Sequence, residues 1–170
     1  MRRHIAILGT GWLGLPLAKT LLEQGYSVKG STTSEGKLAA LTSEGIEAFV
    51  IKVAAEGISG DAKAFLKDVD VLIIDIPPGL RKDPELDFSG GIRKLSEAIE
   101  RAGVRKLLFV SSISVYRETE SFKIYTEGTQ PNAEGRSGKE LFSAERILME
   151  NPSFDTTVLR FGGLLGGERH

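Results

Sequence analysis

The sequence predicts an α/β domain with a doubly wound parallel sheet between two layers of helices. Short apolar, β-branched runs alternate with longer helical patterns along the chain. The run Val69–Ile76 is almost continuously apolar, as expected of a strand covered on both faces. A glycine-rich turn joins the first run to the first helical pattern. This alternation indicates βαβ units, and right-handed crossovers favour the strand order 3-2-1-4-5-6.

The first half of the chain opens with a strand, a glycine turn and a helix. Leu13, Leu17 and Leu21 recur at helical spacing, and Gly25 is the expected C-terminal cap of that helix. The predicted elements of this half are, in order, strand His4–Leu8, helix Trp12–Gln24, strand Tyr26–Ser31, helix Ser34–Ser43, strand Ile46–Val53, helix Asp61–Lys67 and strand Val69–Ile76.

The second half resumes after the break at Pro77-Pro78-Gly79. The first helix there places Ile92, Leu95 and Ile99 on one face, and Gly103 follows as its cap. A long polar stretch, residues 111–135, is expected to be functional or disordered. The predicted elements of this half are helix Gly91–Ala102, with an earlier start near Pro84 as the alternative, strand Leu107–Val110, helix Arg136–Met149 and strand Thr156–Phe161.

The composition excludes several functional classes. The 170 residues include 22 Lys and Arg against 23 Asp and Glu, so the basic excess of a nucleic-acid or membrane-surface binder is absent. There is no cysteine, which excludes disulfides and thiolate sites and fits a cytoplasmic location. The two histidines, His4 and His170, lie at the ends, so neither a histidine triad nor a metal site is predicted. No apolar run reaches the roughly 18 residues that span a bilayer.

The glycine turn predicts binding of a dinucleotide. It follows a predicted strand and opens a predicted helix, the setting in which Gly-x-Gly-x-x-Gly marks a Rossmann fold. The first glycine permits a tight turn, the second lets the backbone approach a pyrophosphate, and the third lets helix and strand pack closely. The helix N-terminus offers free N–H groups to phosphate. The alternative is a turn without a ligand. The predicted contacts are Gly9, Gly11, Trp12, Leu13 and Gly14.

The end of the second strand bears on the choice between NAD and NADP. An acidic residue there would bind the ribose 2′-hydroxyl of NAD. The strand tip instead carries the hydroxyls of Ser31, Thr32 and Thr33, with Lys37 or Lys29 nearby, and Glu35 falls within the next helix. NADP is therefore predicted in preference to NAD. The alternative for this segment is capping of the helix by a hydroxyl side chain.

The end of the fourth strand borders the same crevice. Ile76 and Pro77 are expected to lie against the cofactor, because ligands of doubly wound sheets sit beyond the carboxyl ends of the strands. Asp75 interrupts the apolar strand at this end. It either contacts substrate or the cofactor ribose, or it is a solvated carboxylate at the end of a strand.

The stretch from Gly91 to Tyr116 carries a family resemblance. It reads as a helix ending in Ala-Gly-Val, a strand ending in Ser111-Ser112, and a Val-Tyr pair shortly after. This resembles the extended short-chain dehydrogenases, the NAD(P)-dependent epimerase/dehydratase family, which acts largely on nucleotide sugars. The resemblance implies an oxidoreductase or epimerase for a nucleotide sugar or related hydroxyl substrate. It also implies that Ser112 is the catalytic serine and that Ser111 contacts the cofactor.

The catalytic tyrosine and lysine of that family do not carry over. Aligning Ala144-Glu145 with the family pattern puts Ser137 at the tyrosine position and Leu141 at the lysine position. Ser112 and Ser137 are therefore the catalytic candidates, although a serine hydroxyl is a poor acid at neutral pH. Either Tyr116 or Tyr125 could supply the missing acid, with a packing role favoured for Tyr116. A non-catalytic regulator that senses NADP is the alternative function.

The resemblance covers residues 1–170 as one NAD(P)-binding domain. Members of the family continue into a smaller part that builds the substrate pocket, so a substrate-binding C-terminal part is expected to be missing or truncated here. Family members also pair through two helices, which predicts a homodimer through Gly91–Ala102 and Arg136–Met149. The opening turn also resembles hydroxyacid dehydrogenases, but that reading leaves the Ser111–Tyr116 stretch unexplained.

Overall fold

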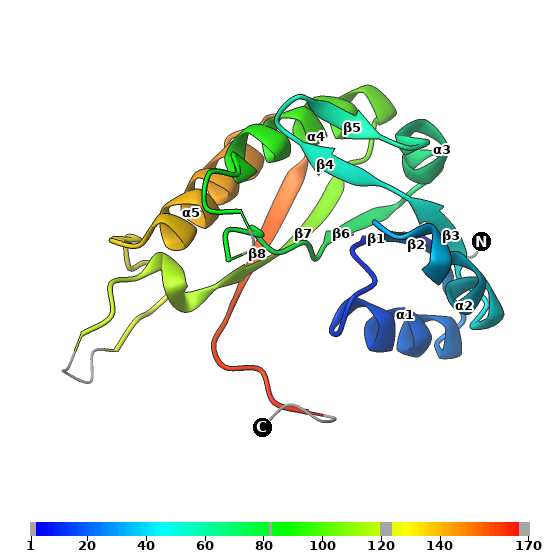
Figure 1. The fold of residues 1–170 in the computed structure, drawn as a ribbon, viewed down its shortest axis with the longest axis horizontal. Helices are drawn as coiled ribbons and strands as arrows, with labels where there is room; N and C mark the ends of the chain where they lie inside the picture. The colour runs from blue at the N-terminus through cyan, green and yellow to red at the C-terminus, as the bar shows by residue number, and fades with distance from the viewer. Residues whose placement is uncertain (1–2, 82, 120–123, 167–170) are drawn as a thin grey trace.

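Six parallel strands form the central sheet in the computed structural model, which describes residues 3–81, 83–119 and 124–166. Their order is β3-β2-β1-β6-β7-β8, so the predicted order is confirmed (Figure 1). The strands are β1 (His4–Leu8), β2 (Ser27–Thr32), β3 (Glu47–Val50), β6 (Val71–Ile74), β7 (Lys106–Ser112) and β8 (Asp155–Phe161). His170 lies outside the described residues.

Helices cover the sheet on both faces, which makes a three-layer α/β/α domain. One face carries α1 and α2, and the other carries α3, α4 and α5 (Figure 1). The helices are α1 (Gly14–Glu23), α2 (Leu38–Ser43), α3 (Ala62–Leu66), α4 (Phe88–Ala102) and α5 (Arg136–Met149), with short 3-10 turns η1 (Glu35–Lys37) and η2 (Ile113–Val115). No helix in the described ranges is long and apolar enough to cross a membrane.

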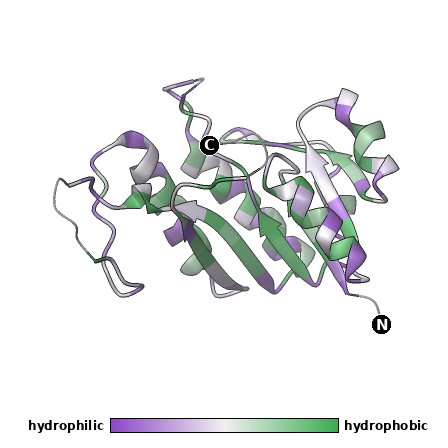
Figure 2. Ribbon diagram, turned by 90° about the horizontal axis from the view of Figure 1, so that it is seen from below, coloured by the Kyte–Doolittle hydropathy of each residue, from purple (hydrophilic) through white to green (hydrophobic). Residues whose placement is uncertain are grey.

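Alternation along the strands supplies two hydrophobic cores. In β1, Ala6 and Leu8 point to the core beneath α4 and α5, while Ile5 and Ile7 point to the core beneath α1 and α2. Figure 2 shows the same pattern as apolar strands between helices of mixed polarity. Each such buried leucine or isoleucine side chain contributes about 1.5–3 kcal/mol of transfer free energy. A central strand buried on both faces is the reason for the continuous apolar runs in the sequence.

The predicted strand Ile46–Val53 is wrong in its second half. Parallel pairing with β2 ends where Val50 faces Thr32, and the chain then turns away. The next residues form a separate antiparallel hairpin of β4 (Lys52–Ala54) and β5 (Gly57–Ser59), which the sequence did not predict. This hairpin packs on α4, where Gly91 leaves room for Val53. The residues of β3 and β4 both favour strands, so the sequence does not show that β3 pairs with β2 and β4 pairs with β5.

The other boundaries shift by a few residues. Pairing with β8 lengthens β7, since the ladder runs from Lys106 opposite Asp155 to Ser112 opposite Phe161. The strand β6 is shorter than predicted and ends before Asp75. Helix α4 begins three residues early because the Asp87 side chain caps it, accepting a hydrogen bond from the Gly90 N–H at 2.7 Å. The bounds of α5 are those predicted.

Candidate functional site

The glycine turn is held in place by the end of β2. The Gly9 N–H donates to the Ser31 hydroxyl at 3.0 Å. Both the N–H and the hydroxyl of Thr10 donate to the Ser31 carbonyl, each at 2.8 Å. Ser31 is 2% exposed, so its hydroxyl supports the turn from below. Whether Ser31 also contacts a cofactor remains a prediction.

The three glycines of the turn differ in what a side chain at each position would meet. Gly9 has a φ of +104°, and a Cβ there would overlap the Asp75 carbonyl. A Cβ on Gly14 would overlap the Gly9 carbonyl, so the third glycine sets the close approach of α1 to the turn. A Cβ on Gly11 would meet nothing within 4 Å. The backbone at Gly11 is therefore open to an approaching ligand.

These residues fit the pyrophosphate of a dinucleotide. Leu13 occupies the N-cap position of α1 and offers no side-chain cap, and the first turn of the helix has no acidic residue of its own. At this helix start the Gly14 N–H donates to the Asp75 carboxylate and the Leu15 N–H donates to the Gly11 carbonyl. The open side of the turn lies at Gly11 and the exposed Trp12, where a pyrophosphate would meet the partial positive charge of the helix N-terminus. The structure brings together Gly9, Gly11, Trp12, Leu13 and Gly14 in one turn, as predicted, and their contacts with a cofactor remain a prediction.

The carboxyl end of β6 lies beside the glycine turn. Ile76 is half-buried and lies beside Gly9, and Pro77 is exposed directly after it. Asp75 reaches back to α1, where the Gly14 N–H donates to its carboxylate. Burial raises the pKa of Asp75 to about 6, and the Gly14 hydrogen bond opposes that rise. Asp75 is therefore not an ordinary solvated carboxylate at a strand end.

The two lysines predicted near a 2′-phosphate, Lys29 and Lys37, have different surroundings in the structure. Lys29 is wrong as a partner of a 2′-phosphate, because its ammonium group donates to the carbonyls of Ala64 and Lys67 at 2.7 and 2.8 Å. Lys37 is exposed in η1, and Thr33 is exposed just before it. The Thr32 hydroxyl accepts from the Ser34 N–H at 3.2 Å. Glu35 lies in η1, as expected.

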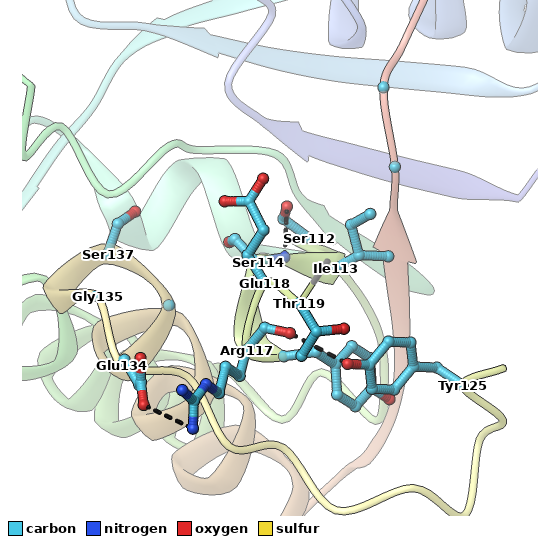
Figure 3. A pocket seen from close by; sticks show the side chains of 14 residues that line it. Ser112, Ile113, Ser114, Arg117, Glu118, Thr119, Tyr125, Glu134, Gly135 and Ser137 are labelled. Carbon is cyan, nitrogen blue, oxygen red and sulfur yellow. Dashed lines mark hydrogen bonds and ion pairs between the residues drawn. The ribbon is translucent and has the colours of Figure 1, made fainter. Parts of the chain in front are cut away.

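A pocket of about 800 Å³ opens at the carboxyl ends of β7 and β8. Ser112 and Ser137, far apart in sequence, both line it. The Ser112 hydroxyl accepts from the Ser114 N–H at 3.1 Å, which leaves its proton available to a ligand. Figure 3 shows these two serines on different sides of the pocket, with Tyr125 and the ion pair of Arg117 and Glu134 along its lower rim. The predicted catalytic pair therefore shares one pocket.

A buried polar network lies behind this pocket. The Ser111 hydroxyl, 4% exposed, donates to Glu145 at 2.7 Å. Arg160 donates to both carboxylate oxygens of Glu145, at 3.0 and 2.8 Å, and to the Tyr116 hydroxyl at 2.6 Å. The hydrogen bond with Glu145 raises the pKa of Arg160 above its usual value. Ser111 thus points into the protein, and its contact with a cofactor remains a prediction.

Sequence reasoning missed this network, although one signal was available. Glu145 occupies the inward face of α5 beside Ala144 and Leu148, and a carboxylate in such a position needs a cationic partner. Arg160 meets that need from β8. The ring of Tyr116 packs against the guanidinium group and stacks on Tyr125, with ring centroids 4.4 Å apart. This agrees with the packing role favoured for Tyr116.

Comparison with known proteins agrees with this geometry. Residues 9–170 match the NAD(P)H-binding family. Protein YeeZ of Escherichia coli K12 is 31% identical over 170 residues, which are 99% of this chain and 61% of that protein. The structure of UDP-N-acetylglucosamine 4-epimerase from Bacillus cereus has a TM-score of 0.78 at 22% identity, covering 98% of this chain and 56% of that one.

A short-chain dehydrogenase/reductase superfamily protein from Agrobacterium tumefaciens, solved with bound NAD, has a TM-score of 0.72 at 22% identity. The match covers 93% of this chain and 48% of that one. The chain therefore spans roughly half to three fifths of the length of these proteins. Since the family match covers most of the chain and includes the glycine turn, the chain belongs to the NAD(P)H-binding family.

Proposed function

We propose that this chain is the dinucleotide-binding domain of an oxidoreductase or epimerase for a nucleotide sugar or a related hydroxyl substrate. One observation carries the proposal: the glycine turn and the pocket that contains Ser112 and Ser137 both lie at the carboxyl edge of one parallel sheet. Ligands of doubly wound sheets bind along this edge. The UDP-sugar epimerases among the structural neighbours support the substrate class through their shared fold.

The bound nicotinamide would accept or donate a hydride, which is the difficult chemical step. The chain's own residues would position the reactants. The glycine turn would hold the pyrophosphate, and the Ser112 hydroxyl would donate a hydrogen bond to a substrate hydroxyl or carbonyl. Ser137 would contact the substrate from the start of α5. The catalytic roles of the two serines are part of the proposal.

NADP is the proposed dinucleotide. The segment after β2 presents exposed Thr33 and Lys37, and Glu35 belongs to η1 and not to the strand tip. A cation and hydroxyl groups suit a 2′-phosphate, whereas a carboxylate at the strand tip would suit a free 2′-hydroxyl. We also propose a cytoplasmic location, in keeping with the absence of cysteine.

The second candidate function is a regulator that binds NADP without turnover. Leu141, at the position of the family lysine, is 5% exposed and belongs to the hydrophobic core. No ammonium group can therefore act from that position, and Ser137 is a poor substitute for a phenol. A screen of nucleotide sugars for NADPH oxidation or epimerisation separates the two candidates. Absence of turnover with tight NADPH binding would favour the regulator.

Calorimetric titration with NADPH, NADH and FAD tests the binding site itself. We expect NADPH to bind and Gly11→Val to abolish binding, because its side chain would fill the open space over the turn. Gly128→Val is the matched control. A Cβ on Gly128 would meet only the Thr126 hydroxyl, at 4.0 Å, and Gly128 lies in the segment between η2 and α5 and not in the glycine turn. Equal NADPH affinity in the wild type and Gly11→Val would refute the proposed site.

A further inference from the structure

Asp75 is a carboxylate that the proposed function leaves without a role. It follows β6 directly, and its own N–H donates to the Leu8 carbonyl at 2.8 Å, which places it beneath the glycine turn. A Cβ built on Gly14 would lie 3.1 Å from the Asp75 Oδ2 atom. The Gly14 N–H donates to the same carboxyl group. Asp75 thus shares the N-terminus of α1 with the proposed phosphate site.

Among the residues that the structure describes, no cationic side chain compensates the charge of Asp75. The turn and the first part of α1, Gly9–Leu17, have no titratable side chain. The adjacent end of β7 presents Ser111 and Ser112, and the loop after Asp75 has its first charge at the exposed Arg81. Burial alone raises the pKa of Asp75 to about 6, and no charged side chain in the described part of the chain contributes.

We propose that Asp75 is part of the cofactor site and that its carboxyl group takes up a proton when a dinucleotide pyrophosphate binds at the glycine turn. This inference rests on the proposed function. An ionised Asp75 and a pyrophosphate would compete for the same helix N-terminus and repel each other. A neutral Asp75 removes the repulsion, and its carbonyl oxygen still accepts from the Gly14 N–H.

The direction of the pH dependence follows from linkage. Below about pH 6 the carboxyl group is already protonated in the free protein, so affinity is highest and independent of this group. Above that pH, binding must include proton uptake, since the bound phosphates raise the pKa of Asp75 further. Affinity then falls by up to about tenfold per pH unit until the pH exceeds the pKa of the complex.

The experiment measures the dissociation constants of NADPH and NADH from about pH 5.5 to about pH 8.5. It compares the wild type with Asp75→Asn, which keeps the hydrogen-bond acceptor for Gly14 and loses the charge. The 2′-phosphate of NADPH titrates in the same range, but it does so equally in both proteins and is absent from NADH. The difference between wild type and variant therefore isolates Asp75.

Asp70→Asn is the matched control. Asp70 lies before the other end of β6 and accepts from the His4 N–H at 2.8 Å, away from the turn. We expect Asp75→Asn to bind either cofactor at about pH 8 at least tenfold more tightly than the wild type, with a smaller pH dependence. Asp70→Asn should follow the wild type. Matching pH profiles for the wild type and Asp75→Asn would overturn the inference.

Proton uptake by the wild type gives a second readout that needs no variant. Binding enthalpies near pH 7, measured in buffers of different ionisation enthalpy, report the protons taken up with NADH. We expect net uptake of up to about one proton. Binding without proton uptake would refute the role of Asp75 and leave the proposed function standing. Absence of binding by the wild type at every pH would refute both.

Discussion

At the scale of single residues, some serines at the strand ends support the fold, whereas another serine lines the candidate site. Ser31 and Ser111 were predicted to contact a cofactor, yet their hydroxyls are buried and bonded to Gly9 and Glu145. Ser112, next to Ser111, lines the pocket instead. Neighbouring residues of a strand point to opposite faces, so one serine faces the core and the other faces the ligand space. Residue type alone carries no such information.

Lys37 is the residue through which the NADP preference can be tested. Lys37→Ala should weaken NADPH binding by about tenfold and leave NADH binding unchanged, because a charged hydrogen bond to phosphate is worth about 1.5–3 kcal/mol. Lys63→Ala is the control, since Lys63 is an exposed lysine of α3. Titration calorimetry with both cofactors measures the effect. An equal loss for NADPH and NADH would show that Lys37 does not read the 2′-phosphate.

At the scale of elements, the network around Glu145 joins three pieces of secondary structure at the pocket. Ser111 comes from β7, Glu145 from α5 and Arg160 from β8. Arg160 also holds Tyr116, whose ring stacks on Tyr125 at the pocket. A buried ion pair adds little net stability when complete, but the loss of one partner leaves an uncompensated charge. The network therefore specifies how these elements meet.

Glu145→Gln should destabilise the fold by about 3 kcal/mol, because it leaves the Arg160 guanidinium without its counter-charge. The matched control is Glu150→Gln, at the residue that directly follows the same helix. Glu150 pairs with Arg146 on the surface and should cost no more than about 1 kcal/mol. Urea denaturation of both variants gives the comparison. Similar losses of stability in the two variants would contradict the assigned difference between buried and exposed pairs.

At the scale of the whole molecule, parallel strand order brings distant segments to one edge. The turn after β1 and the ends of β7 and β8 are far apart in sequence but lie at the same edge of the sheet (Figure 1). The helices α4 and α5 lie together on one face, where the family resemblance predicts pairing of two copies. That homodimer remains a prediction.

Met149 offers a test of pairing through α4 and α5. It is 58% exposed near the end of α5, so a second copy would bury it. Met149→Lys should weaken the dimer by about tenfold or more, since burial of a methionine side chain contributes about 1.5–3 kcal/mol. Leu159→Lys, on the exposed part of β8, should leave it unchanged. Light scattering over a concentration series measures both, and a monomeric wild type would refute the predicted dimer.

The sequence by itself determined the layers, the strand order and the position of the glycine turn. The layers and the turn depend on local periodicity or on spacing within a few residues, as in Gly9–Gly14, where backbone sterics allow few alternatives. The strand order follows from the alternation of strands and helices together with the general right-handedness of parallel crossovers. The exact bounds of α5 were predictable because its apolar spacing persists throughout the helix.

Only the tertiary structure decided which polar groups meet. Three features depend on contacts that local sequence patterns do not show. They are the β4–β5 hairpin, the hydrogen bond of the Lys29 ammonium group to α3, and the ion pair of Glu145 with Arg160. The hydrogen bond between Asp75 and the start of α1 also joins residues that are distant in the sequence. Burial and hydrogen bonding are properties of the assembled fold, since the same aspartate at an open strand end would keep its ordinary pKa.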